Sequence, residues 1–199
     1  MGCNTRLTAV AGGIGTGKSV VSNMLRVMGY PVYDCDSRAK AIMESSEEIR
    51  IRVASEISAD AVDEAGVIDR KRLSEIVFTD PPALKRLNSI VHKAVLYDIE
   101  QWRKALPADV ERAWVESAII YESGIDCIVD CVWQIEAPDR LRIERVMNRN
   151  GLSAEAVRQR IESQSVPHGK IIHKNVHHVI NDGVEPVLPQ LLALLERGK

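Results

Sequence analysis

The run from Gly12 to Ser19 combines glycines with a Lys-Ser pair at a spacing that can hold the phosphates of a nucleotide. It fits the pattern G-x-x-x-x-G-K-[ST] at every position. The glycines allow a tight backbone turn whose N–H groups point at phosphate oxygens, and the next helix adds its positive dipole end. Lys18 is expected to reach the β- and γ-phosphates, and the Ser19 hydroxyl to ligate Mg²⁺. The sequence therefore predicts that the chain binds a nucleoside triphosphate.

The neighbours of this run agree with the prediction, because an apolar stretch at 7–11 leads into it and a helical pattern at 18–28 follows. A chance glycine-rich turn, which is the alternative, rarely carries Lys-Ser at this offset between a strand and a helix. The residues expected to bind the nucleotide are those of the loop and the first helical turn: Gly13, Ile14, Gly15, Thr16, Gly17, Lys18, Ser19 and Val20.

A pair of carboxylates, Asp34 and Asp36, lies at the end of the second predicted strand. Ligands of parallel α/β sheets bind beyond the carboxyl ends of the strands. A carboxylate there can accept a hydroxyl proton or help to hold Mg²⁺ through water. We predict that Asp34, which ends the strand, faces the site and that Asp36 caps the next helix. Capping by both residues is the alternative.

Basic residues outnumber acidic ones between Asp139 and Lys174, and Arg142, Arg145 and Arg149 share one face of a predicted helix. An Arg-rich helix pair after the fourth strand is typical of a lid. Such a lid closes over transferring phosphates, excludes water and lends charge to the transition state. A solvated basic surface is the alternative.

The other titratable side chains give weaker signals. Glu116 and Glu122 flank the third predicted strand, where P-loop enzymes commonly carry an acid linked to the metal. The five histidines lack metal-site spacing, and structural or surface roles are expected for all except His92. The cysteines are expected to be reduced packing residues, with the last two in a buried strand: Cys3, Cys35, Cys127 and Cys131.

The elements that must position these groups alternate between apolar runs and helical patterns, which predicts an α/β fold with a parallel sheet wrapped by helices. Strands are predicted at 7–11, 31–34, 113–117, 128–135 and 178–181. Helices are predicted at 18–28, 139–150 and 153–165, followed by an amphipathic C-terminal helix. Several strands are apolar throughout, as strands covered on both faces are.

Residues 37–107 separate the second strand from the third and contain no convincing strand. One helix there is expected to begin at Asp80-Pro81 and to carry apolar residues at helical spacing over 84–106. An insertion of this size usually supplies a substrate-binding wall, and an idle structural elaboration is the alternative. We therefore predict one P-loop domain over 1–199. Its parts are a core (1–36, 108–138 and 175–199), a helical insertion (37–107) and a lid (139–174).

Composition narrows the function further. The 199 residues suffice for one compact domain, and 45% hydrophobic with 27% charged residues is typical of a globular protein. A net charge of -2 and an aromatic content of 4% argue against nucleic-acid binding. No apolar run approaches a membrane span, and the N-terminus does not read as a signal peptide. A cytoplasmic protein without membrane contact is expected, as a monomer or a small homo-oligomer.

Taken in order, the motifs resemble those of the dephospho-coenzyme A kinase family, over about Thr8 to Leu195. The P-loop alone is not specific, whereas the ordered series is. The similarity rests on these segments: Gly12–Ser19, Tyr33–Asp36, Gly66–Arg70, Leu87–His92, Ala118–Glu122, Arg145 with Arg149, Arg160–Gln164 and Val179–Asn181.

The resemblance implies a P-loop kinase core, a coenzyme-binding function for the helical insertion, and a lid. It implies ATP-dependent phosphorylation of the ribose 3′-hydroxyl of dephospho-CoA, the last step of coenzyme A biosynthesis. By this resemblance, Asp34 looks like the base near the 3′-hydroxyl, and Arg145 and Arg149 resemble the lid arginines. Together with Lys18 of the P-loop, they are the predicted catalytic residues. The resemblance also places His92 on the coenzyme side and Asn181 near the adenine of ATP.

The chain departs from the family pattern at Lys93, at Ser117–Ile120 and at Val176-His177. These departures bear on coenzyme contacts and adenine-side packing rather than on phosphoryl transfer. Two other functions stay open, namely a small-molecule kinase acting on a nucleotide or nucleoside, and a nucleotide-binding switch without a second substrate. The helical insertion and the His92 motif favour the coenzyme, and a switch has no need of an Arg-rich lid.

Overall fold

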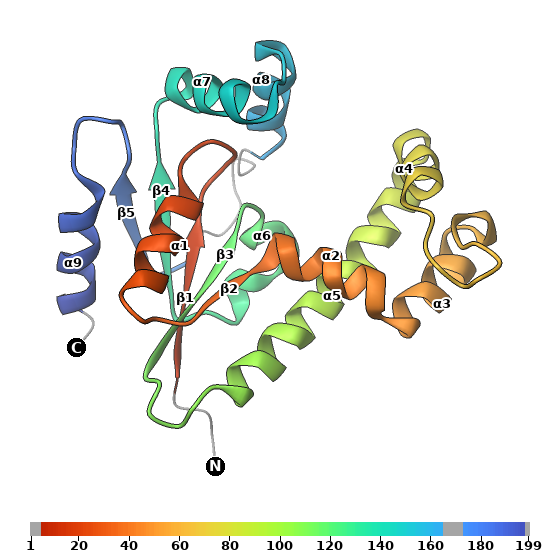
Figure 1. Cartoon of the computed structure of the whole chain (residues 1–199), viewed down its shortest axis with the longest axis horizontal. Coiled ribbons are helices and arrows are strands. Elements are labelled where there is room, and N and C mark those ends of the chain that lie inside the picture. Colours follow the sequence, from red (N-terminus) through yellow and green to blue (C-terminus); the bar gives the residue numbers. More distant parts are fainter. Residues whose placement is uncertain (1–4, 165–172, 198–199) are drawn as a thin grey trace. The chain divides into compact units, whose positions relative to one another are not determined.

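The computed structural model describes residues 5–164 and 173–197, and the chain divides into two compact units (Figure 1). The first unit comprises Met1–Asp34 and Leu106–Lys199, and the second comprises Cys35–Ala105. Parts of three predictions lie outside the described residues: the thiol of Cys3, the structural or surface role of His168, and the lid segment 165–172 with its basic residue Lys170.

The first unit is built on a parallel five-stranded sheet with the strand order β2-β3-β1-β4-β5. The strands are β1 (Arg6–Ala11), β2 (Val32–Asp34), β3 (Arg112–Ser117), β4 (Cys131–Glu136) and β5 (Val176–Ile180). The predicted fold class, a parallel α/β sheet wrapped by helices, is confirmed. Because β1 is the central strand, the loop at its carboxyl end lies between the ends of β3 and β4.

Two helices, α1 (Lys18–Val27) and α9 (Val187–Arg197), pack on one face of this sheet. Each turns an apolar stripe inward, as helices that cover a sheet do. The resulting core joins strand and helix side chains that are nearly or fully buried: Val10, Val21, Leu25, Trp114, Trp133, Ile135, Val179, Leu191 and Leu195. This core fixes the start of α1 relative to the end of β1.

The fourth strand starts later than predicted. The apolar run at 128–135 does not enter the sheet as a whole, since β4 begins only at Cys131. Residues Ile125–Cys127 form a 3₁₀ turn after Gly124. Before the strand starts, the Asp130 amide donates to the Leu7 carbonyl oxygen at 2.8 Å, and the Asp130 carboxylate accepts a hydrogen bond from the Leu7 amide at 2.9 Å. The prediction of Cys127 as a buried strand residue was therefore wrong, because its side chain is exposed. An apolar run alone does not distinguish a strand from a turn beside it.

The helix pair after β4 is confirmed. Helix α7 (Asp139–Asn150) ends at Gly151, which has a φ of 66° that favours glycine. Helix α8 (Ala154–Ser163) begins after Ser153, whose hydroxyl accepts a 3.3 Å hydrogen bond from the Ala156 amide. The two helices share a small core of Val146, Val157 and Ile161.

The second unit is helical and has a core of its own. It contains α2 (Cys35–Ser45), α3 (Glu47–Glu56), the 3₁₀ helix η1 (Ala59–Ala61), α4 (Arg70–Thr79) and α5 (Pro81–Ala105). The core consists of side chains from four of these elements: Ile49, Val53, Ala61, Leu73 and Ile90. The predicted start of the long helix is confirmed, since the Asp80 carboxylate accepts a hydrogen bond from the Ala83 amide at 3.1 Å.

The predicted cap at Asp36 was wrong. Helix α2 begins at Cys35, directly after the last residue of β2, so Asp36 lies inside the first helical turn. A strand that passes into a helix without a linking residue leaves no position for a separate cap. Asp36 is exposed there, and a carboxylate in the first turn still favours the positive end of the helix dipole.

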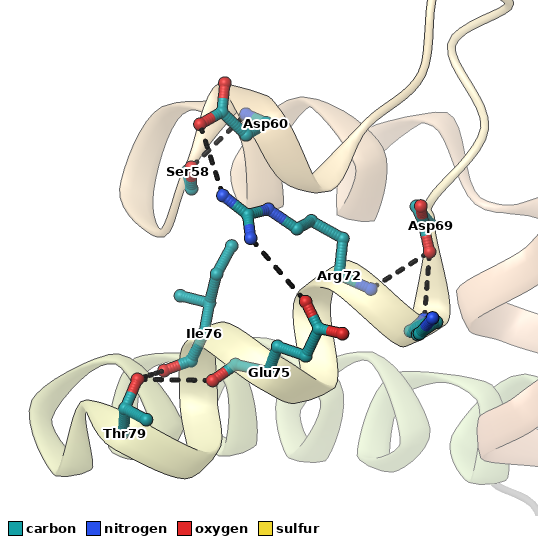
Figure 2. Close-up of polar contacts among 8 residues, drawn as sticks. Ser58, Asp60, Asp69, Arg72, Glu75, Ile76 and Thr79 are labelled. Atoms are coloured by element: carbon teal, nitrogen blue, oxygen red, sulfur yellow. Dashed lines mark hydrogen bonds and ion pairs between the residues drawn. The ribbon is translucent and has the colours of Figure 1, made fainter.

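The segment Gly66–Arg70, one of the motifs quoted above, closes a turn and starts α4. The Asp63 carboxylate accepts a hydrogen bond from the Val67 amide at 2.8 Å, and Val62 bridges Ile68. Figure 2 shows Asp69 accepting two hydrogen bonds from the first turn of α4, including one at 3.0 Å from the Arg72 amide. The Arg72 side chain reaches Glu75 and Asp60. The motif thus has a structural role of its own.

Replacing Asp69 by alanine is expected to lower the free energy of unfolding by about 1 kcal/mol, because two amides of α4 lose their side-chain acceptor. Urea unfolding followed by circular dichroism measures the change. Asp69→Asn is the control, since asparagine caps a helix about as well as aspartate. An Asp69→Ala variant as stable as the original chain would contradict the capping role.

Candidate active site

The loop between β1 and α1 depends on glycine at two crowded positions. Gly17, the N-cap of α1, has a φ of 100°, and a Cβ there would collide with the Asn181 side chain. A Cβ on Gly12 would lie 2.5 Å from the Ile135 carbonyl oxygen. Because Gly17 has no side chain, no side-chain cap binds the first amides of α1. These amides and the positive end of the helix dipole can therefore receive an anion.

Lys18 lies at the start of α1 and reaches back over the loop. Its Nζ donates to the Gly13 carbonyl oxygen at 3.3 Å. Thr16 closes the same turn from within, because its hydroxyl donates to Gly13 at 3.0 Å. The ammonium group is thus held at the loop in which the sequence predicts phosphate binding.

Two carboxylates and a hydroxyl gather beside the loop at the carboxyl ends of β2 and β3. The Ser19 hydroxyl donates to Glu116 Oε1 at 2.9 Å, and Glu116 is 8% exposed. Asp34 is the register partner of Glu116 on the neighbouring strand, so the two side chains emerge on the same face. Like charges in this arrangement repel each other, and a cation between them relieves the repulsion. Glu122, the other acid considered, is exposed on the short helix α6 (Ile120–Ser123).

Helix α7 contacts the loop through two of the three arginines predicted on its inner face. Arg142 Nε donates to the Ile14 carbonyl oxygen at 3.0 Å, and Arg145 Nη1 donates to that of Gly15 at 3.4 Å. Arg149 is exposed, and its Nε donates to Asn150 Oδ1 at 2.9 Å. At a rise of about 1.5 Å per residue, Arg149 lies about 6 Å further along the helix axis than Arg145. Its predicted role therefore requires a movement that the other two do not need.

Asn181 joins the segment after β5 to the loop. Its Nδ2 donates to the Thr16 carbonyl oxygen at 2.8 Å, and its backbone N–H donates to Glu136 at 2.8 Å. Its carbonyl oxygen accepts from Arg145 Nη2 at 3.1 Å. The residue thus connects the loop, β4 and α7. Its predicted position near an adenine stays a prediction.

Gln164 is a site residue that reasoning from residue chemistry missed. It follows α8, and its Oε1 accepts a hydrogen bond from the Ile14 amide at 2.6 Å. This amide is one that a phosphate oxygen can use in a P-loop. An uncharged glutamine at the end of a polar helix carries no chemical signal of its own, so only the family motif Arg160–Gln164 pointed to it.

A cavity of about 540 Å³ lies between the loop, the end of β4, the helix pair and the segment after β5. Its size is in the range of small-molecule sites. The walls include Gly13, Thr16, Glu136, Arg142, Gln164 and Asp182. Backbone N–H groups of Glu185 and Val184 bind the Asp182 carboxylate and lower its pKa, so this wall is negatively charged at neutral pH. The cavity adjoins the phosphate-binding loop and can hold the remainder of a nucleotide.

His92 belongs to the helical unit, where it is half-buried on α5. Its predicted role in coenzyme binding stays a prediction. Val20, also predicted to contact the nucleotide, lies in the first turn of α1 with 49% of its surface exposed. Within residues 5–164 and 173–197, no helix combines the length and the apolar character needed to cross a membrane.

Removing the lid charges is expected to lower kcat. Arg149→Ala should lower kcat more than it raises KM for ATP, as interactions made only in the transition state do. Arg145→Ala, which also removes a contact with the loop, should have a larger effect, about 10²-fold. Steady-state kinetics at varied ATP measures both values.

The matched control for the lid is Arg158→Ala, which changes an exposed arginine of α8 that pairs with Glu155 at 3.7 Å. Exposed pairs of this kind contribute little, so kcat should stay within about twofold. If the triple replacement of Arg142, Arg145 and Arg149 leaves kcat unchanged, the basic face is only a solvated surface.

Comparison with known proteins gives a consistent result over nearly the whole chain. The family described as dephospho-CoA kinase matches residues 6–184. The sequence is 38% identical to a dephospho-CoA kinase from Porphyromonas gingivalis over 187 residues, which cover 94% of this chain and 91% of the relative. The crystal structure of TT1252 from Thermus thermophilus is similar with a TM-score of 0.79 and 31% identity, covering 97% of both chains. The dephospho-CoA kinase from Campylobacter jejuni shares the fold, with a TM-score of 0.67, 24% identity and coverage of 96% and 98%.

Proposed function

The chain belongs to the dephospho-CoA kinase family, and we propose that it transfers the γ-phosphoryl group of ATP to the ribose 3′-hydroxyl of dephospho-CoA. The products are coenzyme A and ADP, so the reaction is the final step of coenzyme A biosynthesis. The observation that carries the proposal is the placement of Asp34 beside Glu116 and Ser19, next to a phosphate-binding loop. A binding protein without an acceptor substrate would use this carboxylate only to hold Mg²⁺, whereas a kinase also uses it to take the proton of the acceptor hydroxyl.

The loop and the start of α1 bind the triphosphate. The amides at the start of α1, where no side chain caps the helix, and the Lys18 ammonium group offer donors and positive charge to the β- and γ-phosphates. The Ile14 amide also binds the triphosphate, once its hydrogen bond to Gln164 Oε1 is replaced by one to a phosphate oxygen. The nucleoside then occupies the adjoining cavity, with Asn181 on the loop side of it.

Asp34 orients the acceptor. As the last residue of β2 it lies where ligands of parallel sheets bind, and as a carboxylate it can accept the proton of the 3′-hydroxyl. The oxygen then attacks the γ-phosphorus as the bond to the leaving β-phosphate oxygen breaks. Positioning and charge stabilisation account for most of the catalysis of such transfers.

Ser19, Glu116 and Asp34 fit the needs of Mg²⁺, which prefers oxygen ligands and keeps several of its waters. The Ser19 hydroxyl would hold the ion directly, and the two carboxylates would hold it directly or through water. When bound, Mg²⁺ neutralises charge on the β- and γ-phosphates. The three side chains share one small region, so the ion would also relieve the repulsion between the two carboxylates.

The lid arginines supply charge on the opposite side of the phosphates. Arg142 and Arg145 already contact the loop, which makes α7 a support for the triphosphate. Arg149 joins them when α7 closes. The helical unit, with His92 on α5, binds the coenzyme portion of the acceptor. We further propose that the protein acts in the cytoplasm, as a monomer or small homo-oligomer, without nucleic-acid partners.

ATP turnover with dephospho-CoA, compared with AMP, adenosine and pantothenate as acceptors, tests the proposal. We expect ADP formation to depend on dephospho-CoA, and phosphorus NMR to locate the new phosphate on the ribose 3′-oxygen. Preference for AMP or adenosine would indicate a nucleotide or nucleoside kinase instead. Nucleotide binding without turnover on any acceptor would indicate a switch.

A further inference from the structure

Gln190, a half-buried residue of α9, pairs with the backbone of the last residue of β5. Its Oε1 accepts a hydrogen bond from the Ile180 amide at 2.8 Å, and its Nε2 donates to the Ile180 carbonyl oxygen at 2.9 Å. The strand β5 lies at an edge of the sheet, with α9 beside it in Figure 1. Because the Asn181 amide points at Glu136 on β4, the backbone groups of Ile180 point to the open side. Gln190 therefore supplies the pairing that an edge strand lacks.

The Gln190 side chain also joins the two ends of the segment 181–186, which links β5 to α9. Its Nε2 donates to the Pro186 carbonyl oxygen at 3.1 Å, in addition to that of Ile180. Within the segment, the Asp182 carboxylate accepts hydrogen bonds from the amides two and three residues further on, both at 2.9 Å. One side chain thus fixes both ends of a segment that has a turn of its own.

The residues held in this way form one side of the candidate nucleotide site. Ile180 and Asp182 line the cavity beside the phosphate-binding loop. Asn181, which lies between them, donates to the Thr16 carbonyl oxygen at 2.8 Å and accepts from Arg145 at 3.1 Å. The lining residues within the described part of the chain do not include Gln190, so its influence on the cavity passes through the backbone of Ile180.

We infer that Gln190 is a positioning residue for nucleotide binding, which holds the segment 181–186 in the shape that receives the nucleoside of ATP. A ligand binds more tightly to a preorganised site, because less conformational freedom is lost on binding. The triphosphate depends less on Gln190, since the phosphate-binding loop has its own bond from Thr16 to Gly13 at 3.0 Å. This role rests on the proposed binding of ATP in the cavity, and it adds a residue that does not touch the ligand.

The variant Gln190→Met tests this role, because methionine is similar in length but offers no strong donor or acceptor. Titration calorimetry on the full chain compares ATP with inorganic tripolyphosphate, each in the presence of Mg²⁺. We expect the Kd for ATP to rise about fivefold to tenfold, and the Kd for tripolyphosphate to stay within about twofold. In steady-state kinetics the KM for ATP should rise with a much smaller change in kcat, as loss of uniform binding predicts.

The matched control is Leu192→Ala, two residues further along α9 at a position that is 46% exposed. It should leave both dissociation constants within about twofold. Three results would each overturn the positioning role: unchanged ATP binding in Gln190→Met, equal weakening of ATP and tripolyphosphate in that variant, or the same loss of ATP binding in Leu192→Ala.

A second variant covers the case in which Gln190→Met fails to fold, as judged by its melting curve. Gln190→Ala removes the same three hydrogen bonds, and the same selective loss of ATP binding is expected. The original chain separates this role from the proposed function. If it binds tripolyphosphate but not ATP, both are wrong, whereas normal ATP binding in both Gln190 variants overturns the positioning role alone.

Discussion

The Lys18→Ala variant is expected to fold normally and to lose about 10²–10³-fold or more in phosphoryl transfer. A positioned donor of this kind contributes on the order of 3–4 kcal/mol to the transition state. Lys18 sits at the start of α1, outside the buried core, and its ammonium group donates to the Gly13 carbonyl oxygen of the loop. Its removal should therefore spare the sheet and the core. ADP formation with saturating dephospho-CoA measures the rate, and circular dichroism checks the fold.

Lys18→Arg is the matched control, because it keeps the positive charge and changes its geometry. A planar guanidinium is larger than an ammonium group and presents its donors differently. We expect Lys18→Arg to recover only part of the lost rate. A folded Lys18→Ala enzyme with near-normal turnover would remove the basis for assigning the loop to phosphate binding.

The Asp34→Asn variant is expected to lose about 10²–10⁴-fold in kcat while ATP binding changes little. The amide keeps the size of the side chain but cannot take a proton from the acceptor hydroxyl. Asparagine also caps helices about as well as aspartate, so a purely structural Asp34 at the start of α2 would tolerate the change. Single-turnover rates, ATP affinity and the melting temperature together separate these two roles.

Asp36→Asn is the control, two residues away in the first turn of α2. Its effect on kcat should be much smaller, since a solvent-exposed first-turn carboxylate contributes mainly to helix stability. If Asp36→Asn is the more damaging of the two, the wrong carboxylate has been assigned to the acceptor hydroxyl.

The sequence predicted those features of the fold that depend on residues close together in the chain, such as the ends of helices. Gly151 ends α7 because glycine adopts a positive φ, Ser153 caps α8 with its hydroxyl, and Asp80 caps α5 before Pro81. The P-loop was predictable for the same reason, since its glycines and its Lys-Ser pair act within one turn. The parallel sheet followed from the alternation of apolar runs with helical patterns.

Contacts between distant segments were not predictable. Whether Asp34 lies beside Glu116 depends on the register of β2 against β3, which are separated by the whole helical unit. The bonds from Gln164 and Arg142 to Ile14 depend on how the helix pair packs on the loop. The start of β4 at Cys131 is fixed by Asp130 binding Leu7, and an apolar run does not encode such a pairing.

The contact between Gly17 and Asn181 constrains how this protein can evolve. A side chain at position 17 meets two separate obstacles, a φ of 100° that L-residues avoid and a clash with Asn181. A smaller residue at position 181 would relieve the clash but not the backbone strain, so no second substitution opens position 17. Position 181 is sterically free to shrink and is held instead by its hydrogen bond to Thr16. The dependence therefore runs in one direction. Glycine at position 17 leaves room for different side chains at position 181, whereas no residue at position 181 makes a side chain at position 17 acceptable.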